Sequence, residues 1–270
     1  MTQAIEELCR KFQNLDHEWN KKNHDCKDCL RRVEEITSAL TKCSFLPDNE
    51  SEASRRELHI ARNTLEIAIM LASEIQDIPA FEHYMSQLKC YYYDYKGVIP
   101  DSPYKYEFLG LNLLFLLSQR RLADFHIELE RLTIEEITSS VYINHPVSME
   151  QYLMEGNFHK VFLSKGNVPS KRYDYFIDIF LNATRDEVAY CIEDAYEILS
   201  LKDATPMLFF KSDAETRLFG EKRKWKLVND TFHFPKSKKR TDDVIPSAHV
   251  TRIYICPESS VGCGMKCNPI

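Results

Sequence analysis

Hydrophobic positions recur every three or four residues through the first part of the chain, which is the spacing of one face of an α-helix. Four such stripes precede residue 100, and a polar loop around Pro47 separates the second from the third. Each stripe covers one side of a helix and needs a neighbouring helix to bury it. The stripes are Ile5, Leu8, Phe12, Leu15 and Trp19; Cys26, Cys29, Val33, Ile36, Leu40 and Cys43; Leu58, Ala61, Leu65, Ala68, Ala72 and Ile75; and Phe81, Tyr84, Leu88, Tyr91 and Tyr95.

The segment from Tyr104 to Leu117 is apolar nearly all round, so it predicts a central helix that is covered on several sides. A shorter striped helix follows it. Successive antiparallel helix pairs of this kind stack into a helical-repeat solenoid. We find no strict sequence repeat, so the repeat is one of structure. The residues of the shorter stripe are Leu122, Phe125, Leu129 and Leu132.

The spacing of the apolar residues changes near Pro169. We interpret His145-Pro146 as a turn between helices, because proline interrupts helical hydrogen bonding. Beyond Pro169 the apolar spacing predicts two helices and then two shorter ones. Their expected ranges are 173–182, 185–199, 204–210 and 213–224.

A β-hairpin is predicted directly after these helices. Trp225 and Leu227 alternate with lysines, and Phe232 and Phe234 alternate with polar residues. The two-residue turn Asn229-Asp230 separates the runs, and period-two patterning around such a turn indicates two antiparallel strands. Helices followed by a small hairpin make a winged helix. Pro235 closes the second strand, and residues 236–240 begin a polar linker.

Composition places the chain among folded proteins of the cytoplasm or nucleus. Of its 270 residues, 44% are hydrophobic and only seven are glycine, which favours long helices over a turn-rich β fold. The longest uncharged apolar stretch, 108–119, is shorter than the roughly 20 residues that a membrane helix needs. The start lacks the order of a signal peptide. Nine cysteines in such a setting are interpreted as reduced thiols.

The net charge of −6 is unevenly distributed. Residues 221–240 carry eight lysines and arginines against two acids, a basic cap on an acidic body. A winged helix with such a cap could bind DNA through phosphate contacts. The helix that would read bases, however, offers Met207, Leu208 and apolar aromatic side chains in place of polar ones. We therefore do not favour nucleic acid as a partner.

No motif in the chain predicts catalysis or a metal site. His24, Cys26 and Cys29 resemble part of a zinc site, and Cys263 and Cys267 could complete it, but their remote position matches no common finger. An apolar helical seam explains Cys26 and Cys29 without metal. The paired acids are interpreted as solvated helix faces, and nucleophile and phosphate-loop motifs are absent from the sequence. We expect no enzyme activity, no cofactor and no small-molecule substrate. The paired acids are Glu135-Glu136, Asp186-Glu187 and Glu193-Asp194.

The three long runs over 113–132, 145–170 and 185–197 resemble one family, the small PCI-domain subunits of the 26S proteasome lid, known as non-ATPase regulatory subunit 8. The run HPVSMEQYLMEGNFHKVFLSKGNVPS (145–170) is similar to the family's stretch around a Tyr-Leu-Met-Glu-Gly element. The run RDEVAYCIEDAYE (185–197) is similar to the family's helix with the pattern Arg-x-Glu-(Ile/Val)-Ala-x-Cys-Ile-Glu-x-Ala-Tyr. The run over 113–132 resembles the pair of helices that comes earlier in the family's sequences. The similarity extends, with decreasing strength, from near the N-terminus to about Ser247.

The resemblance implies a mainly α fold: a right-handed helical-repeat solenoid capped by a winged helix with a small β-hairpin, together a PCI domain. The expected division is N-terminal helical repeats over 1–70, a PCI domain over 71–240 (helical part 71–168, winged helix about 170–235) and a linker with an atypical, disordered tail over 241–270. The implied function is that of a non-catalytic scaffold in the lid of the 19S regulatory particle. That role supports lid assembly and ubiquitin-dependent protein degradation in cytoplasm and nucleus.

The implied partners are other PCI-domain subunits of the lid, in a hetero-oligomer. Winged helices of such subunits pack edge to edge, so the candidate interface is the hairpin side chains Trp225, Leu227, Phe232 and Phe234. Family members end in an amphipathic helix, which the Cys/Gly/Pro-rich segment 248–270 replaces here, and we expect this departure to impair incorporation into the lid. Two alternatives stay open: a PCI subunit of a translation-initiation or signalosome complex, and a nucleic-acid-binding winged helix.

Overall fold

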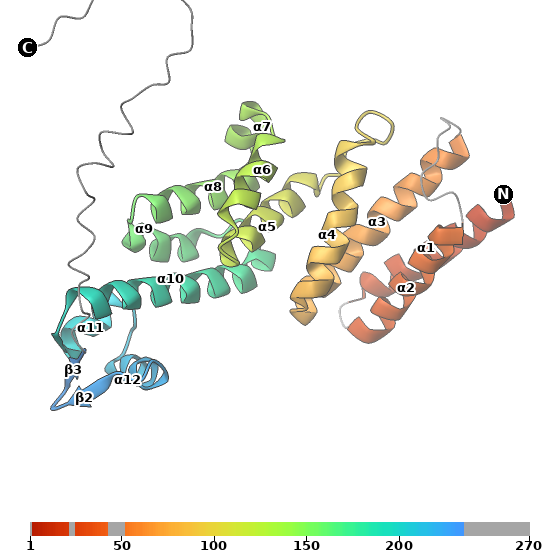
Figure 1. Cartoon of the computed structure of the whole chain (residues 1–270). Helices are drawn as coiled ribbons and strands as arrows, with labels where there is room; N and C mark the ends of the chain where they lie inside the picture. The colour runs from red at the N-terminus through yellow and green to blue at the C-terminus, as the bar shows by residue number, and fades with distance from the viewer. Residues whose placement is uncertain (1, 22–24, 43–51, 235–270) are drawn as a thin grey trace, which may run out of the picture. The chain divides into compact units, whose positions relative to one another are not determined.

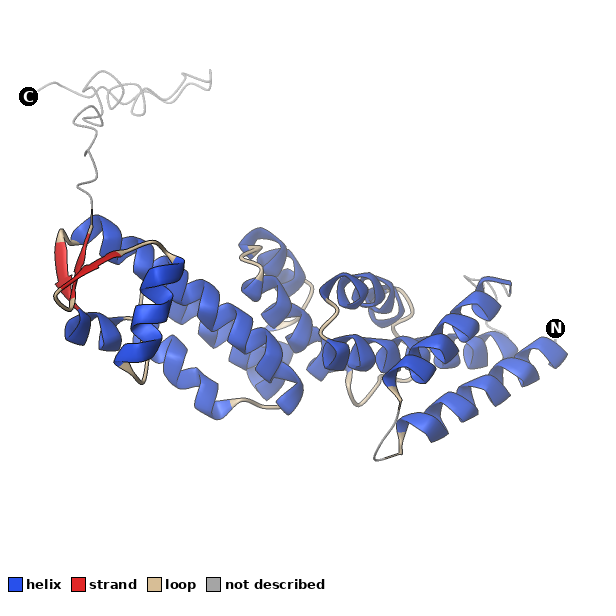
Figure 2. Ribbon diagram, turned by 90° about the horizontal axis from the view of Figure 1, so that it is seen from below, coloured by secondary structure: helices blue, strands red, loops and turns tan. Residues whose placement is uncertain are grey.

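The computed structural model describes residues 2–21, 25–42 and 52–234 (Figure 1). Contacts group the chain into two compact units, Met1–Ala189 and Tyr190–Ile270. Helices account for most of the described residues, and the strands form one small antiparallel sheet, as Figure 2 shows. The predicted mainly helical fold class with a small β element is therefore confirmed. The predicted domain boundaries at residues 70, 168 and 240 stay predictions, and the tail over 241–270 lies outside the described residues.

The first unit is built from helices that follow one another with short connections. The four stripes and the central apolar segment each form a helix, as predicted. The helices are α1 (Thr2–Trp19), α2 (Cys26–Lys42), α3 (Glu52–Ile75), α4 (Ile78–Tyr93), α5 (Lys105–Ser118), α6 (Leu122–Glu130), α7 (Ile134–Ser139), α8 (Val141–Met154), α9 (Phe158–Leu163) and α10 (Asp174–Ala195), with the 3-10 turns η1 (Ser164–Asn167) and η2 (Lys171–Tyr173).

Helices α1 to α4 pack as sequence neighbours, and Figure 1 shows them side by side. Helix α1 contacts both α2 and α3, and α3 contacts α2 and α4. The stripe residues are the ones that become buried: Leu15 of α1 and Val33 of α2 are both 0% exposed. Complete burial of such a side chain stabilises the folded state by about 1.5–3 kcal/mol. The stripes therefore predict both the helices and the faces through which they pack.

Helix α5 is central, as its composition predicts, because almost every residue from Lys105 to Ser118 is buried. It packs against α6 and α8. Three aromatic rings join it to α4 and α10: Phe115 lies 5.3 Å from Phe81 and 5.8 Å from Phe176, measured between ring centroids. Tilted aromatic pairs at such distances add to the stabilisation from burial alone.

The backbones of α5 and α8 approach closely at Gly110. A methyl group built on Gly110 would overlap the carbonyl oxygen of Tyr142 and lie 2.5 Å from the hydroxyl oxygen of Tyr173. The same carbonyl has lost its usual helical partner, because residue 146 is proline and has no N–H. The prediction of a turn at His145-Pro146 is thus wrong: Pro146 lies inside α8 and is buried. Only glycine at position 110 leaves room for this contact.

A second correction concerns the helices predicted over 173–182 and 185–199. They form one continuous helix, α10, because no glycine or proline separates them. Thr184, at the expected break, is 1% exposed, and its hydroxyl donates to the carbonyl of Phe180 at 2.9 Å. The helix also ends earlier than predicted, at Ala195, so that Leu199 lies in a strand.

The second unit combines two short helices with a three-stranded sheet. The two helices near 204–210 and 213–224 and both strands of the hairpin are confirmed, whereas the first strand was not predicted. The strand order is β1-β3-β2 with antiparallel pairing throughout. The elements are β1 (Ile198–Ser200), α11 (Leu201–Met207), α12 (Asp213–Lys222), β2 (Lys226–Val228) and β3 (Thr231–His233).

Candidate partner interface

The hairpin turn at Asn229 and Asp230 fixes the geometry of the candidate interface. Both residues have positive φ, 47° and 58°, as a two-residue hairpin turn with the right-handed twist of its strands requires. The hydroxyl of Thr231 donates to the carbonyl of Val228 at 2.6 Å across the turn. Asn and Asp tolerate this backbone region better than most residues, so the turn is encoded locally.

The register divides the apolar side chains of the sheet between two faces. Leu199, Phe232 and Leu227 stand opposite one another in one row across the three strands. Phe232, on the central strand, is 1% exposed, and its ring lies 2.8 Å from where a side chain on Gly220 of α12 would begin. Leu227, on the edge strand β2, is 41% exposed, whereas Leu199, on the opposite edge strand β1, is 6% exposed. The row is therefore core at β1 and β3 and surface at β2.

Trp225 is the organising side chain behind the hairpin. Its ring centroid lies 5.1 Å from those of both Phe232 and Phe234, in edge-to-face geometry. Its indole Nε1 donates to a carboxylate oxygen of Glu193 at 2.6 Å, and the same oxygen accepts from Nε of Arg223 at 2.8 Å. These contacts hold the start of β2 against the end of α10.

The carboxylate of Glu193 is ionised in this setting. Its partial burial by itself raises the pKa, but the hydrogen bonds from Arg223 and Trp225 outweigh burial and place the pKa of Glu193 below its ordinary value. The acids of the pair Glu193-Asp194 were interpreted as a solvated face. For Glu193 that interpretation is wrong, because its side chain is 31% exposed and holds two partners. Nothing in the local spacing distinguishes it from Asp194.

The structure places the four predicted interface residues in different environments. Leu227 is exposed and Trp225 half-buried, whereas Phe232 and Phe234 are 1% and 7% exposed and form part of the core. In this fold Phe232 and Phe234 support the hairpin from inside, and Leu227 lies at its surface. Two further apolar side chains were not predicted: Ile198 of β1 is 58% exposed and Val228 of β2 is 52% exposed. A role of the hairpin in partner binding stays a prediction.

The outer edge of β2 is open within the described part of the chain. Every residue of β2 is exposed, and β3 is its one strand partner there. An edge strand presents unpaired N–H and C=O groups that can pair with another chain. Lysines at positions 222, 224 and 226 are also exposed beside this edge. The edge can therefore bind an extended segment of another protein.

In the described part of the second unit, residues 190–234, the charged side chains do not form a base-reading surface. In α11, Lys202 is the one basic residue, and Leu201 and Ala204 of the same helix are buried. Leu208, just beyond it, is 0% exposed. Arg217 is paired with Asp230 of the turn at 2.6 Å. These placements favour a protein partner over a nucleic acid.

The other acid pairs have structural partners. Glu136 closes a capping box with Thr133 at the start of α7, and the hydrogen bond from the Thr133 backbone lowers the pKa of Glu136. Glu187 lies 3.3 Å from Arg120. Neither arrangement separates two carboxyl groups across a cleft, which acid–base catalysis by a carboxylate pair requires.

Two cysteines of the candidate zinc site, Cys26 and Cys29, lie on α2. Cys29 is 1% exposed and Cys26 is partly buried against the same core, as an apolar seam predicts. His24, Cys263 and Cys267 lie outside the described residues. Over the described ranges, no three or more His, Cys, Asp or Glu side chains are grouped to hold a metal ion. Over the same ranges, no helix is both long enough and apolar enough to span a membrane.

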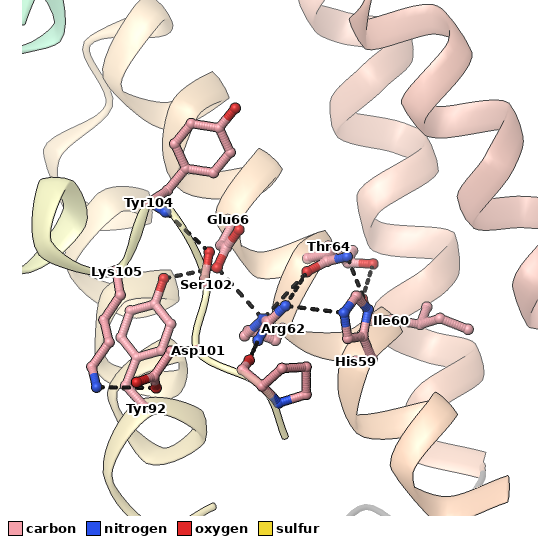
Figure 3. Close-up of polar contacts among 12 residues, drawn as sticks. His59, Ile60, Arg62, Thr64, Glu66, Tyr92, Asp101, Ser102, Tyr104 and Lys105 are labelled. Carbon is pink, nitrogen blue, oxygen red and sulfur yellow. Dashed lines mark hydrogen bonds and ion pairs between the residues drawn. The ribbon is translucent and has the colours of Figure 1, made fainter. Parts of the chain in front are cut away.

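A buried polar network in the first unit joins α3, α4 and the loop before α5 (Figure 3). Glu66 of α3 is 6% exposed and accepts from the hydroxyl of Tyr92 at 2.8 Å. Arg62, one helical turn away, lies 3.6 Å from Glu66 and donates to the carbonyl of Pro100. The hydroxyl of Ser102 in the same loop accepts from the backbone N–H of Tyr104 at 3.3 Å.

The network is structural because its groups bind one another. Burial is the main influence on Glu66 and raises its pKa, and hydrogen bonds from Ser102 and Tyr92 oppose this shift. Burial also raises the pKa of Tyr92 strongly. The sequence signal that could have identified the network is an Arg62–Glu66 pair at i and i+4 inside an otherwise apolar stripe. Its effect is to attach the loop to α3.

Taken together, the stacked helices and the short helices with a three-stranded antiparallel sheet define the class of PCI-type helical-repeat proteins with a winged helix. A model of the CSN8/PSMD8/EIF3K family matches residues 103–244. The chain belongs to this family.

Relatives of the chain align over most of its length. The 26S proteasome non-ATPase regulatory subunit 8 of Caenorhabditis elegans is 38% identical, over 82% of this chain and 85% of its own. The 26S proteasome non-ATPase regulatory subunit 8 homolog A of Arabidopsis thaliana is 36% identical, over 88% of this chain and 90% of its own. The 26S proteasome regulatory subunit RPN12 of Saccharomyces cerevisiae is 31% identical, over 82% of this chain and 83% of its own.

Proposed function

We propose that the chain is a non-catalytic scaffold subunit in the lid of the 26S proteasome regulatory particle, where it supports lid assembly and ubiquitin-dependent protein degradation. The observation that carries the proposal is the extent of the similarity. Relatives named as regulatory subunits of the 26S proteasome match 82–88% of this chain at 31–38% identity. The match includes both the helical stack and the winged helix.

The absence of catalysis is supported by how the polar side chains are used. The carboxylates of Glu66, Glu136 and Glu193 each accept hydrogen bonds that hold a neighbouring helix, a helix start or an indole in place. A general acid or base has to face a substrate cavity instead. The chain therefore acts through binding.

The partners proposed for the chain are other PCI-domain subunits of the lid. The exposed edge of β2, with Leu227 and Val228 beside it, offers main-chain hydrogen bonds for affinity and apolar side chains for selectivity. Phe232 and Phe234 contribute by keeping the edge strand in register, since both are packed against Trp225. Such a subunit works where proteasomes work, in the cytoplasm and nucleus.

The interface is tested by a single charge at the edge. Leu227→Asp removes an exposed apolar contact and adds a charge that a partner would have to desolvate. We expect it to reduce recovery of lid subunits with the affinity-tagged chain at least about tenfold, which corresponds to about 1.4 kcal/mol. Leu163→Asp is the matched control, because Leu163 is 64% exposed on α9 in the first unit. Equal recovery of lid subunits with the two variants would mean that the hairpin is not part of the interface.

The two alternatives make different predictions for the same purification. A translation-initiation or signalosome subunit would recover those complexes in place of proteasome subunits. A nucleic-acid-binding winged helix would bind duplex DNA in a salt-sensitive way, and neutralising Lys222, Lys224 and Lys226 would abolish that binding. We expect salt-sensitive duplex binding to be absent.

A further inference from the structure

A pocket of about 180 Å³ lies within the first unit, between helices α1 and α3 and the residues that lead into α5. Its apolar lining includes Ile67 and Met70 of α3, which are both buried. Cavities that hold whole cofactors or drug-sized ligands are larger, about 300–1,000 Å³. The volume of this pocket therefore suits a single side chain.

Three aromatic side chains line the same pocket. Phe12 and Trp19 come from α1, and Tyr104 is the residue directly before α5. Tyr104 is 47% exposed, and Phe12 and Trp19 are half-buried, so part of each ring is accessible to a guest. The face of an aromatic ring carries partial negative charge and attracts cations.

The charged groups of the pocket leave one carboxylate without a cation. Arg172 lies 3.0 Å from a carboxylate oxygen of Glu107, and Glu66 lies 3.6 Å from Arg62. Asp16 differs, because no ion pair joins its carboxylate to another residue of the described ranges. Its side chain is exposed, so water solvates the charge, and a guest that displaces this water has to replace it with hydrogen-bond donors. The lining therefore favours a cationic guest.

We propose that this pocket binds an arginine side chain that a partner protein supplies. A guanidinium is planar, so it can stack on the aromatic lining while it donates two parallel hydrogen bonds to the carboxylate of Asp16. The carboxylate is held in position by Asn20, whose side-chain amide donates to Oδ1 of Asp16 at 3.1 Å. The methylenes of the guest lie against Ile67 and Met70.

Arginine fits this lining better than lysine. A guanidinium is less strongly hydrated than an ammonium group, and it is found more often on aromatic faces. The pocket belongs to the first unit, whereas the hairpin proposed as a partner interface belongs to the second. The inference therefore does not rest on the proposed function.

The test is a titration of the isotope-labelled full chain, followed by NMR at the indole N–H signals. The chain has two tryptophans: Trp19 lines the pocket, and Trp225 of the second unit does not, so the signal of Trp225 is an internal reference. The probes are N-acetyl-arginine methylamide, its neutral isostere N-acetyl-citrulline methylamide, and N-acetyl-lysine methylamide.

We expect the arginine probe to shift the Trp19 signal saturably and to leave the Trp225 signal unchanged. The citrulline and lysine probes should bind roughly tenfold more weakly, because the first lacks the charge and the second lacks the planar pair of donors. Binding of either probe as tight as that of the arginine probe, or no saturable shift with the arginine probe, would overturn the proposal.

Two variants locate the binding. Asp16→Asn keeps an acceptor for the Asn20 amide but removes the charge, so the affinity for the arginine probe should fall roughly tenfold. Tyr104→Leu removes an accessible ring from a position that is 47% exposed, so the same affinity should fall roughly threefold or more.

Asp94→Asn is the matched control, because it removes one charge at an exposed position that does not line the pocket. We expect it to leave the affinity for the arginine probe unchanged. Unchanged affinity in Asp16→Asn or in Tyr104→Leu, or an equal loss of affinity in Asp94→Asn, would mean that the arginine probe does not bind in this pocket.

Discussion

Replacing Gly110 by alanine should destabilise the first unit, because α5 and α8 have no space for a methyl group there. The added Cβ would overlap the Tyr142 carbonyl oxygen and lie 2.8 Å from its carbon. It would also lie 2.5 Å from the hydroxyl oxygen of Tyr173, a residue that is 0% exposed. The Tyr173 hydroxyl donates to the carbonyl of Glu107 at 2.7 Å, so moving the Tyr173 side chain away from the methyl group breaks a buried hydrogen bond.

The magnitude follows from three contributions. Overpacking a core position costs about 1–3 kcal/mol. Leaving the Tyr173 hydroxyl without its partner costs about another 1–3 kcal/mol. Alanine in place of glycine in a helix returns about 1 kcal/mol. The expected net loss is about 3 kcal/mol, which lowers the melting temperature of a unit of this size by about 6–12 °C.

The assay is thermal and urea unfolding of Gly110→Ala beside Gly166→Ala. Gly166 has nothing within 4 Å of its added Cβ, so its variant carries the same chemical change without the overlap. The double variant Gly110→Ala with Tyr173→Phe removes one of the two obstructing groups, and its loss should fall short of the sum of the single losses. Equal stability of the two glycine variants would refute the close packing of α5 on α8.

Two further variants test the polar groups. Trp225→Phe keeps an aromatic ring in the core but removes the hydrogen bond to Glu193. Urea unfolding should therefore show a free energy of unfolding lower by about 1–2 kcal/mol. An unchanged urea midpoint would contradict the hydrogen bond. The variant Glu66→Gln tests the effect of burying a carboxyl group. Burial raises the pKa of Glu66 in the folded state above its unfolded value of about 4.5. The contribution of Glu66 to stability is therefore complete below about pH 4.5 and is lost as the pH rises through the folded-state pKa. The stability of the wild type relative to Glu66→Gln should therefore fall as the pH rises above about 4.5. A difference between the two proteins that does not change with pH would be the opposing result.

The sequence predicted those parts of the fold that depend on local periodicity. The stripes of α1 to α4 and the all-round apolar character of α5 identify helices and their buried faces, since both follow from 3.6 residues per turn. The hairpin at Asn229-Asp230 was predicted for the same kind of reason, because its turn chemistry is local. The tertiary environment of these elements is not needed to recognise them.

The features that were missed depend on distant residues. Pro146 lies inside a helix because the carbonyl it leaves free is accommodated at Gly110, which is 36 positions away in the sequence. Strand β1 has only three residues and forms by pairing with β3. In the candidate interface, alternation identifies the apolar positions of each strand, but only the packing of α12 against Phe232 decides that Phe232 is buried while Leu227 is exposed.

The central claim is tested most directly by asking whether the full chain is a component of assembled 26S proteasomes. The measurement is native-gel separation of an extract from cells carrying the tagged chain at its own locus, with quantitative mass spectrometry of the band that contains assembled 26S particles. The account predicts that the chain is present in that band together with other lid subunits. Its absence from the band, with the intact chain recovered free or in another complex, would contradict the account.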